Sequence, residues 1–178
     1  MSPSERPWPA ALRGRAIILR AITIAAAFAL PVATISVLIL SPVDIITAAK
    51  VAPPNQPLSA LEEVVCIAVA SIPVLLIGYG LMQLARAFAA IANGEYFSQR
   101  MFGSLRVFAA SLSLSGFASL LVAPIVSLLV TWGNEERSLA ISIGSPQLGL
   151  IFFGALLWVL AQLLERAAEI EAENREIV

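Results

Sequence analysis

Four long apolar stretches, separated by short polar segments, dominate the chain. They run over Ile17 to Leu40, Val64 to Ala90, Leu105 to Trp132 and Leu148 to Leu164. Each is close to or longer than the ~20 residues that an α-helix needs to cross a hydrocarbon layer of ~30 Å. The pattern therefore predicts an all-α, polytopic membrane protein, with a single domain over residues 1–178 that forms a bundle of four transmembrane helices.

The composition points the same way. Hydrophobic residues make up 59% of the 178 residues and charged residues only 13%, and the mean hydropathy is +0.89. A soluble domain does not bury so large an apolar share. We expect neither a soluble catalytic domain nor a DNA-binding domain at either end, and therefore no direct binding of nucleic acid.

Basic residues fall mainly on one side of the predicted membrane. Nine of the eleven lie on the side shared by the N-terminus, the second loop and the C-terminus: Arg6, Arg13, Arg15, Arg20, Arg86, Arg100, Arg106, Arg166 and Arg175. Lys50 and Arg137 lie in the first and third loops. Because Lys and Arg accumulate in cytoplasmic segments, both termini are predicted to be cytoplasmic. They comprise a basic segment over residues 1–16 and an acidic helical tail over residues 165–178 that prolongs the fourth helix.

A cleaved signal peptide is the competing interpretation of the N-terminus. A basic start precedes an apolar run that contains the small-x-small triplet Ala27-Phe28-Ala29. The apolar region of a signal peptide spans about 7 to 15 residues, whereas this run continues to Leu40. We expect the first span to be retained.

The side chains that most often perform chemistry are scarce. The chain has one cysteine and no histidine, which excludes histidine-based haem ligation, Ser-His or Cys-His nucleophilic pairs and histidine zinc sites. Cys66 is expected to pack as a small hydrophobic residue. The centres of the spans carry no ionisable residue, which is unusual for ion-coupled transport. We expect no catalytic residue, no cofactor, no metal site and no enzymatic activity.

Small residues indicate where the helices touch, because they let backbones approach closely in lipid. Two series recur at helical spacing: Ser111, Ser115 and Ser119 on the third span, and Gly154, Ala161 and Ala168 on the fourth. Packing within one chain is the favoured use of these faces, and a homo-oligomer contact is the alternative.

Other signals concern the shape and the ends of the helices. Pro31, Pro73 and Pro124, one in each of the first three spans, are expected to give static kinks rather than hinges. Ser59 with Glu62 predicts a capping box that starts the second helix.

The predicted cytoplasmic face holds the candidate functional residues. Asn93-Gly94 is a helix stop, and a short aromatic turn follows before Ser98 restarts a helix. Glu165 lies at the depth of the arginines that end the spans, so we expect it to pair with Arg86 or Arg20 and lock the helices together. The candidate partner-binding or bundle-locking residues are Arg20, Arg86, Gly94, Tyr96, Phe97, Arg106, Glu165, Glu169 and Glu173.

Two short cytoplasmic strings carry a family resemblance. They are Ile91-Ala92-Asn93-Gly94-Glu95-Tyr96-Phe97-Ser98 with Leu105-Arg106, and Leu160-Ala161-Gln162 running into Glu173-Asn174 and Ile177-Val178. In them the chain resembles a bacterial family of four-span membrane proteins, the domain of unknown function numbered twenty-nine seventy-five. The resemblance implies a place in the bacterial inner membrane. Because members are often encoded beside a small helix-turn-helix regulator, it also implies such a regulator as a partner. It carries over no catalytic residue.

The leading hypothesis is a membrane-embedded regulatory or interaction protein that holds a soluble partner at its cytoplasmic face. The acidic tail would bind that partner through basic residues. Two alternatives stay open, a small oligomeric transporter or channel and an accessory subunit of a larger membrane complex.

Overall fold

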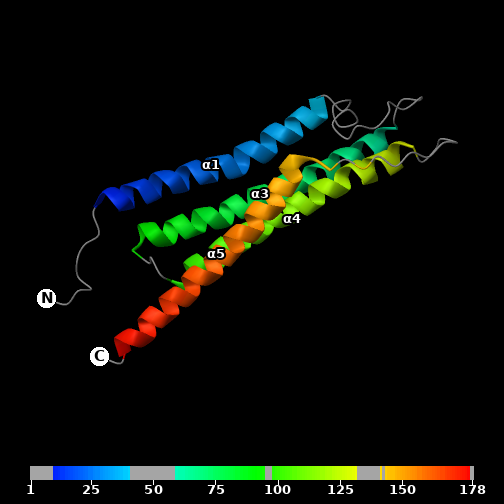
Figure 1. The fold of residues 1–178 in the computed structure, drawn as a ribbon. Coiled ribbons are helices and arrows are strands. Elements are labelled where there is room, and N and C mark those ends of the chain that lie inside the picture. The colour runs from blue at the N-terminus through cyan, green and yellow to red at the C-terminus, as the bar shows by residue number, and fades with distance from the viewer. Residues whose placement is uncertain (1–9, 41–58, 95–97, 132–140, 142, 177–178) are drawn as a thin grey trace.

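Four long helices make up the described part of the chain. The computed structural model describes residues 10–40, 59–94, 98–131, 141 and 143–176, with side chains from residue 13 to residue 170 within these ranges. The helices are α1 (Ala10–Leu40), α3 (Ala60–Ala92), α4 (Gln99–Val130) and α5 (Ser145–Glu176), as Figure 1 shows. All four are long and apolar enough to cross a membrane. The predicted all-α, four-span architecture is confirmed at this level, and α5 continues well past the fourth apolar stretch.

Local signals set the ends of α3 and the start of α4. At the start of α3, the Ser59 hydroxyl accepts a hydrogen bond from the Glu62 amide at 3.3 Å, and the Ser59 amide donates to a Glu62 carboxylate oxygen at 2.8 Å. Gly94, just after the C-cap, has φ of +89°, a conformation that side chains with a Cβ rarely adopt. The Ser98 hydroxyl then caps α4 by accepting from the Met101 amide at 3.2 Å. The predicted capping box, helix stop and restart are all confirmed.

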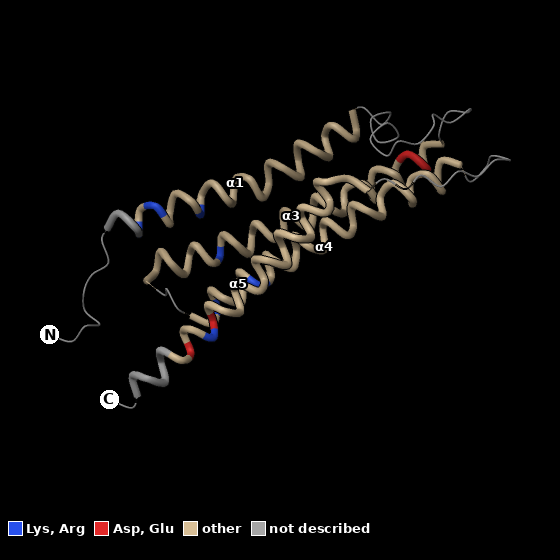
Figure 2. The backbone as a smooth tube through the Cα atoms, in the orientation of Figure 1, with Lys and Arg blue, Asp and Glu red and all other residues tan. Residues whose placement is uncertain are grey.

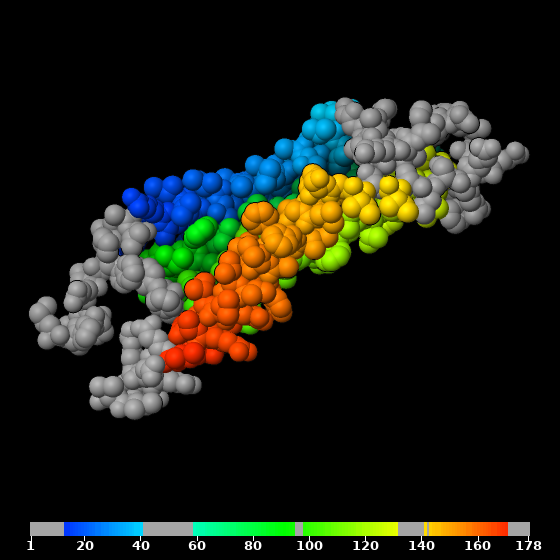
Figure 3. Space-filling model, viewed as in Figure 1, coloured from blue at the N-terminus to red at the C-terminus, as the bar shows by residue number. Residues whose placement is uncertain are grey.

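The helices pack in the order in which they follow one another along the chain. The extensive contacts of the described residues are α1 with α3, α3 with α4, and α4 with α5. Figure 3 shows the consequence, because α3 is visible between α1 and α5 over the left half of the view. The predicted bundle is therefore an open series of helices, in which α5 is joined to the rest mainly through α4.

Large apolar side chains lie mostly on the outside. Among the described residues, nine of the thirteen buried hydrophobic residues are alanine. Leu40, Phe152 and Ile18 are 81%, 67% and 61% exposed. Such a surface is strongly unfavourable in water and is normal against lipid tails. The distribution of side chains thus agrees with the spans predicted from hydropathy.

One small apolar cluster lies between α3 and α4. Cys66 is 3% exposed and packs with Ala123, Val126 and Val130, and Leu38 of α1 packs against the cluster. The expectation that Cys66 packs as a small hydrophobic residue is confirmed.

Hydrogen bonds from serines tie α4 to both of its neighbours. The Ser115 hydroxyl, which is fully buried, donates to the backbone carbonyl of Pro73 on α3 at 2.9 Å. The Ser113 hydroxyl donates to the carbonyl of Ile151 on α5 at 3.2 Å. In addition, Pro31 of α1 packs against α3 at Gly78. Of the predicted series on the third span, Ser115 bonds to α3 and Ser111 packs at Gly80 of α3, so this face is used for packing within the chain.

The α4–α5 crossing depends on the absence of a side chain at Gly154. A Cβ atom at this position would lie 2.6 Å from both the carbonyl oxygen of Ala109 and the backbone nitrogen of Ser113. Backbone atoms cannot move aside without displacing a helix. Ala161, two turns further along α5, is fully buried, so the predicted seam of small residues on the fourth span does face α4.

We predict that Gly154→Ala destabilises the protein, because the added methyl group forces α4 and α5 apart. The expected loss is about 1–3 kcal/mol, the usual cost of overpacking. Gly149→Ala is the matched control, since nothing lies within 4 Å of a Cβ at that position of the same helix. Thermal unfolding in detergent measures both variants, and equal stability of the two would contradict this account of the crossing.

Candidate functional site

Charged side chains gather at the two ends of the helices. Figure 2 shows the arginines at the start of α1, the end of α3, the start of α4 and the lower part of α5, and acidic residues at the opposite end of α3. We call the first of these the basic end. Its described arginines are Arg13, Arg15, Arg20, Arg86, Arg100, Arg106 and Arg166. Glu62 and Glu63 mark the opposite end.

An ion pair joins α4 to α5 at the basic end. Arg106 Nη1 lies 3.2 Å from Glu165 Oε2, and Arg106 Nη2 donates to Glu165 Oε1 at 3.4 Å. The Glu165 side chain is 16% exposed and that of Arg106 is 38% exposed. Two parallel N–H···O contacts of this kind give a guanidinium–carboxylate pair both strength and direction.

The partner of Glu165 differs from the expected one. The sequence led us to expect Arg86 of α3 or Arg20 of α1, and the structure pairs Glu165 with Arg106 instead. The reason is the packing order, since α5 lies against α4 and not extensively against α3 or α1. Arg20 is exposed on α1, and Arg86 Nη1 donates to the Gln83 side-chain oxygen at 3.0 Å.

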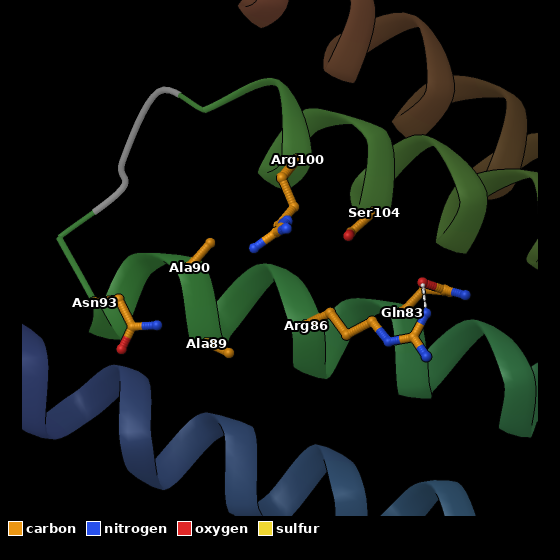
Figure 4. A pocket seen from close by; sticks show the side chains of 7 residues that line it. All are labelled: Gln83, Arg86, Ala89, Ala90, Asn93, Arg100 and Ser104. Atoms are coloured by element: carbon orange, nitrogen blue, oxygen red, sulfur yellow. Dashed lines mark hydrogen bonds between the residues drawn. The ribbon is translucent and has the colours of Figure 1, made fainter.

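A cleft of about 450 Å³ lies between the end of α3 and the start of α4. Its lining residues are Gln83, Arg86, Ala89, Ala90, Asn93, Arg100 and Ser104. In Figure 4, Arg100 and Ser104 extend from α4 toward α3, while Gln83, Arg86 and Asn93 come from α3. No carboxylate is among the lining residues.

The cleft arginines have no acidic partner in the described part of the chain, where the Arg106–Glu165 pair is the one ion pair. Gln83 is 7% exposed, and its side-chain oxygen accepts a hydrogen bond from Arg86. This bond fixes the position of the guanidinium group against a buried side chain. A guanidinium has five N–H donors, and this bond uses one of them. The arrangement is suited to binding an anion through several hydrogen bonds.

The other predicted site residues are distributed as follows. Gly94 ends α3 and Glu169 is exposed on α5. Tyr96 and Phe97 lie outside the described residues, as does the side chain of Glu173, although its backbone belongs to α5. The sequence analysis did not identify Gln83, Asn93 and Ser104 as site residues. Their spacing from Arg86 and Arg100 on the two facing helices was the signal that could have revealed them.

One comparison with known proteins gives a match. Residues 21–178 match the family described as "Protein of unknown function (DUF2975)", which covers nearly the whole chain. No curated protein matches, and no solved structure matches. The family resemblance seen in the two short sequence strings is thereby confirmed.

We predict a measurable coupling between Arg106 and Glu165. In a double-mutant cycle of Arg106→Gln and Glu165→Gln, the expected interaction free energy is about 1 kcal/mol, because the pair is partly shielded from solvent. Glu169→Gln, one turn further along α5 and exposed, is the control and is expected to show no coupling with Arg106→Gln. Unfolding in detergent at low salt measures the cycle, and additive effects of the two main substitutions would show that the pair contributes nothing.

Proposed function

The chain belongs to the DUF2975 family of proteins of unknown function, and we propose that it is a membrane-embedded interaction protein. In this proposal it spans the bacterial inner membrane four times, with both termini in the cytoplasm. It holds a soluble regulatory protein at the basic end of the helices. The proposed partner is a basic protein, such as a small helix-turn-helix regulator.

The observation that carries the proposal is the separation of charge along the helices. Among the described residues, arginines occupy the basic end, glutamates occur at both ends, and the middle of each helix carries no charged residue. Polar recognition is therefore concentrated where the helices would leave the membrane. An excess of arginine is also what cytoplasmic segments show, which supports placing this end in the cytoplasm.

The acidic end of α5 supports the proposed mode of binding. Glu165 is already engaged by Arg106, whereas Glu169 is exposed, and the helix continues to Glu176. Glu173 follows Glu169 at a spacing of four residues, which places both positions on one side of the helix. We call the positions of Glu169 and Glu173 the acidic strip. Carboxylates at these positions, on a helix that continues past its apolar stretch, would attract a basic surface.

A transporter, the alternative function, would require a polar pathway between the helices. The described residues place no charged side chain at the middle of a span, and polar pathways through membranes usually include such groups. A transporter would therefore require several copies of the chain. Ion or solute flux through liposomes that contain the purified protein would favour it over the interaction protein.

We predict that the acidic strip is required for partner capture. Affinity purification of the crosslinked, tagged protein from native membranes is expected to recover a small basic protein. The variant Glu169→Gln/Glu173→Gln is expected to recover about tenfold less, because two charge-assisted contacts are lost. Truncation after Glu165 is expected to abolish capture.

The control for this experiment is Glu63→Gln, which removes one negative charge at the opposite end of α3. It is expected to leave the recovery unchanged. Recovery of the same protein by the truncated form would overturn the proposed role of α5. Recovery of a large membrane complex by all forms would identify an accessory subunit instead.

We also predict the orientation of the helices. The chain has one cysteine, so Cys66→Ser gives a background for single reporter cysteines. Ser145 and Gln99 are exposed and start α5 and α4 at opposite ends of the helices. In spheroplasts, a membrane-impermeant maleimide is expected to label Ser145→Cys at once and Gln99→Cys only after lysis. The reverse pattern would place the basic end outside the cell.

A further inference from the structure

The cleft between α3 and α4 combines three features that the partner-binding proposal does not use. It is large enough for a small ligand, at about 450 Å³. It contains two arginines without a carboxylate partner among the described residues. It also contains three neutral hydrogen-bonding side chains, those of Gln83, Asn93 and Ser104.

The charges around the cleft leave it positive. Glu165 is the first acidic residue of α5, and it forms an ion pair with Arg106. Glu169 projects from α5, which packs on α4 and contributes no residue to the cleft. The positive dipole end at the start of α4 is balanced by the negative dipole end at the end of α3, so the positive charge of the cleft comes from its two arginines. An anionic group in the cleft would offset part of the charge of Arg86 and Arg100.

The types of residue that line the cleft indicate which class of anion it would bind. Arg86 and Arg100 present planar guanidinium groups, which bind phosphate oxygens through paired hydrogen bonds better than a lysine does. Ser104, which extends from α4 toward α3, can donate a further bond to the phosphate oxygens. Figure 4 shows Arg100 and Ser104 extending from α4 toward α3, while the Arg86 guanidinium lies along α3 beside Gln83. A headgroup in the cleft can therefore contact both helices.

The depth of the cleft indicates the source of the phosphate. Arg86 lies ten residues beyond the midpoint of α3 (Ala60–Ala92), which corresponds to about 15 Å along the helix axis. Half the thickness of the hydrocarbon layer is also about 15 Å. The cleft therefore lies at the level of the lipid headgroups when the helices span a bilayer. Basic pockets between membrane helices at this level bind anionic headgroups.

We propose that the cleft lined by Arg86, Arg100 and Ser104 binds the phosphate of an anionic phospholipid headgroup. The site is formed by α3 and α4 alone, so it does not depend on the acidic strip of α5 or on a protein partner. The phosphate offsets part of the positive charge of the two arginines and bridges α3 and α4 at this end. Zwitterionic lipids bind less well, because their ammonium group faces the same positive cleft.

Native mass spectrometry of the purified full-length protein tests the site. The protein is titrated with phosphatidylglycerol, with phosphatidylcholine and with inorganic phosphate. The wild-type protein is expected to retain phosphatidylglycerol. The variant Arg86→Gln/Arg100→Gln is expected to bind it at least about tenfold more weakly, since two charge-assisted contacts are lost.

Matched variants separate this site from general charge effects. Arg166→Gln removes a positive charge from an exposed position of α5 at the same end and is expected to bind like the wild type. Arg86→Lys/Arg100→Lys keeps the charge and is expected to bind with intermediate affinity. Ala89→Leu narrows the cleft without changing its charge and is expected to weaken binding. This last variant tests the site even if the double glutamine variant fails to fold.

Each other outcome overturns the proposal. Equal retention of phosphatidylglycerol by the wild type, by Arg86→Gln/Arg100→Gln and by Ala89→Leu would show that the lipid binds elsewhere. Displacement of phosphatidylglycerol by millimolar inorganic phosphate would assign the cleft to a soluble phosphate. Because the readout is lipid retention, failure here leaves partner capture through α5 unaffected, and failure of partner capture leaves this site unaffected.

Discussion

The arrangement of the helices depends on the close approach of α5 to α4 at Gly154, where no side chain fits. This contact fixes both the depth and the rotation of α5. Ala161 and Glu165 follow Gly154 by seven and eleven residues, which are two and three helical turns. They therefore continue the face that Gly154 presents to α4. The fully buried Ala161 and the Arg106–Glu165 pair both lie on that face. In lipid, where apolar side chains gain little by touching one another, such backbone contacts determine which helices become neighbours.

The choice of neighbours determines the electrostatics of the basic end. Because α5 meets α4, the partly buried Glu165 carboxylate compensates Arg106, and Arg86 and Arg100 are left without an acidic group from the described residues. Had α5 packed against α3, Glu165 would have met Arg86 and the cleft would carry a lower charge. The described residues thus give a positive cleft between α3 and α4 and an exposed carboxylate, Glu169, on α5. The two proposed ligands, a lipid headgroup and a basic protein, would meet opposite charges at the same end.

The sequence predicted the elements far better than their contacts. Apolar run length identified all four helices, and Ser59, Glu62, Gly94 and Ser98 located ends of α3 and α4, because these are local effects encoded within a few residues. The partner of Glu165 was predicted wrongly. Arginines of three helices lie at a similar predicted depth in the membrane, and depth alone does not show which of them faces Glu165. The cleft was missed for a related reason. Its residues come from two helices, and they line one cleft only when each helix has the right rotation about its own axis. Contacts between the helices, such as the hydrogen bond from Ser115 to Pro73, determine that rotation.

The two proposed binding surfaces are coupled through α4 to only a limited extent. Arg100 and Ser104 of the cleft and Arg106 of the ion pair lie on the same helix within two turns of one another. The described charged link from that helix to α5 is the pair with Glu165, whose interaction is on the order of 1 kcal/mol. A coupling free energy of that size changes affinity at a second site by about fivefold. Through this pair, a headgroup bound as proposed would modulate, and not switch, the proposed binding of a protein to α5. This limit favours a constitutive tether, in which the lipid stabilises the helices and the acidic strip holds the partner at the membrane.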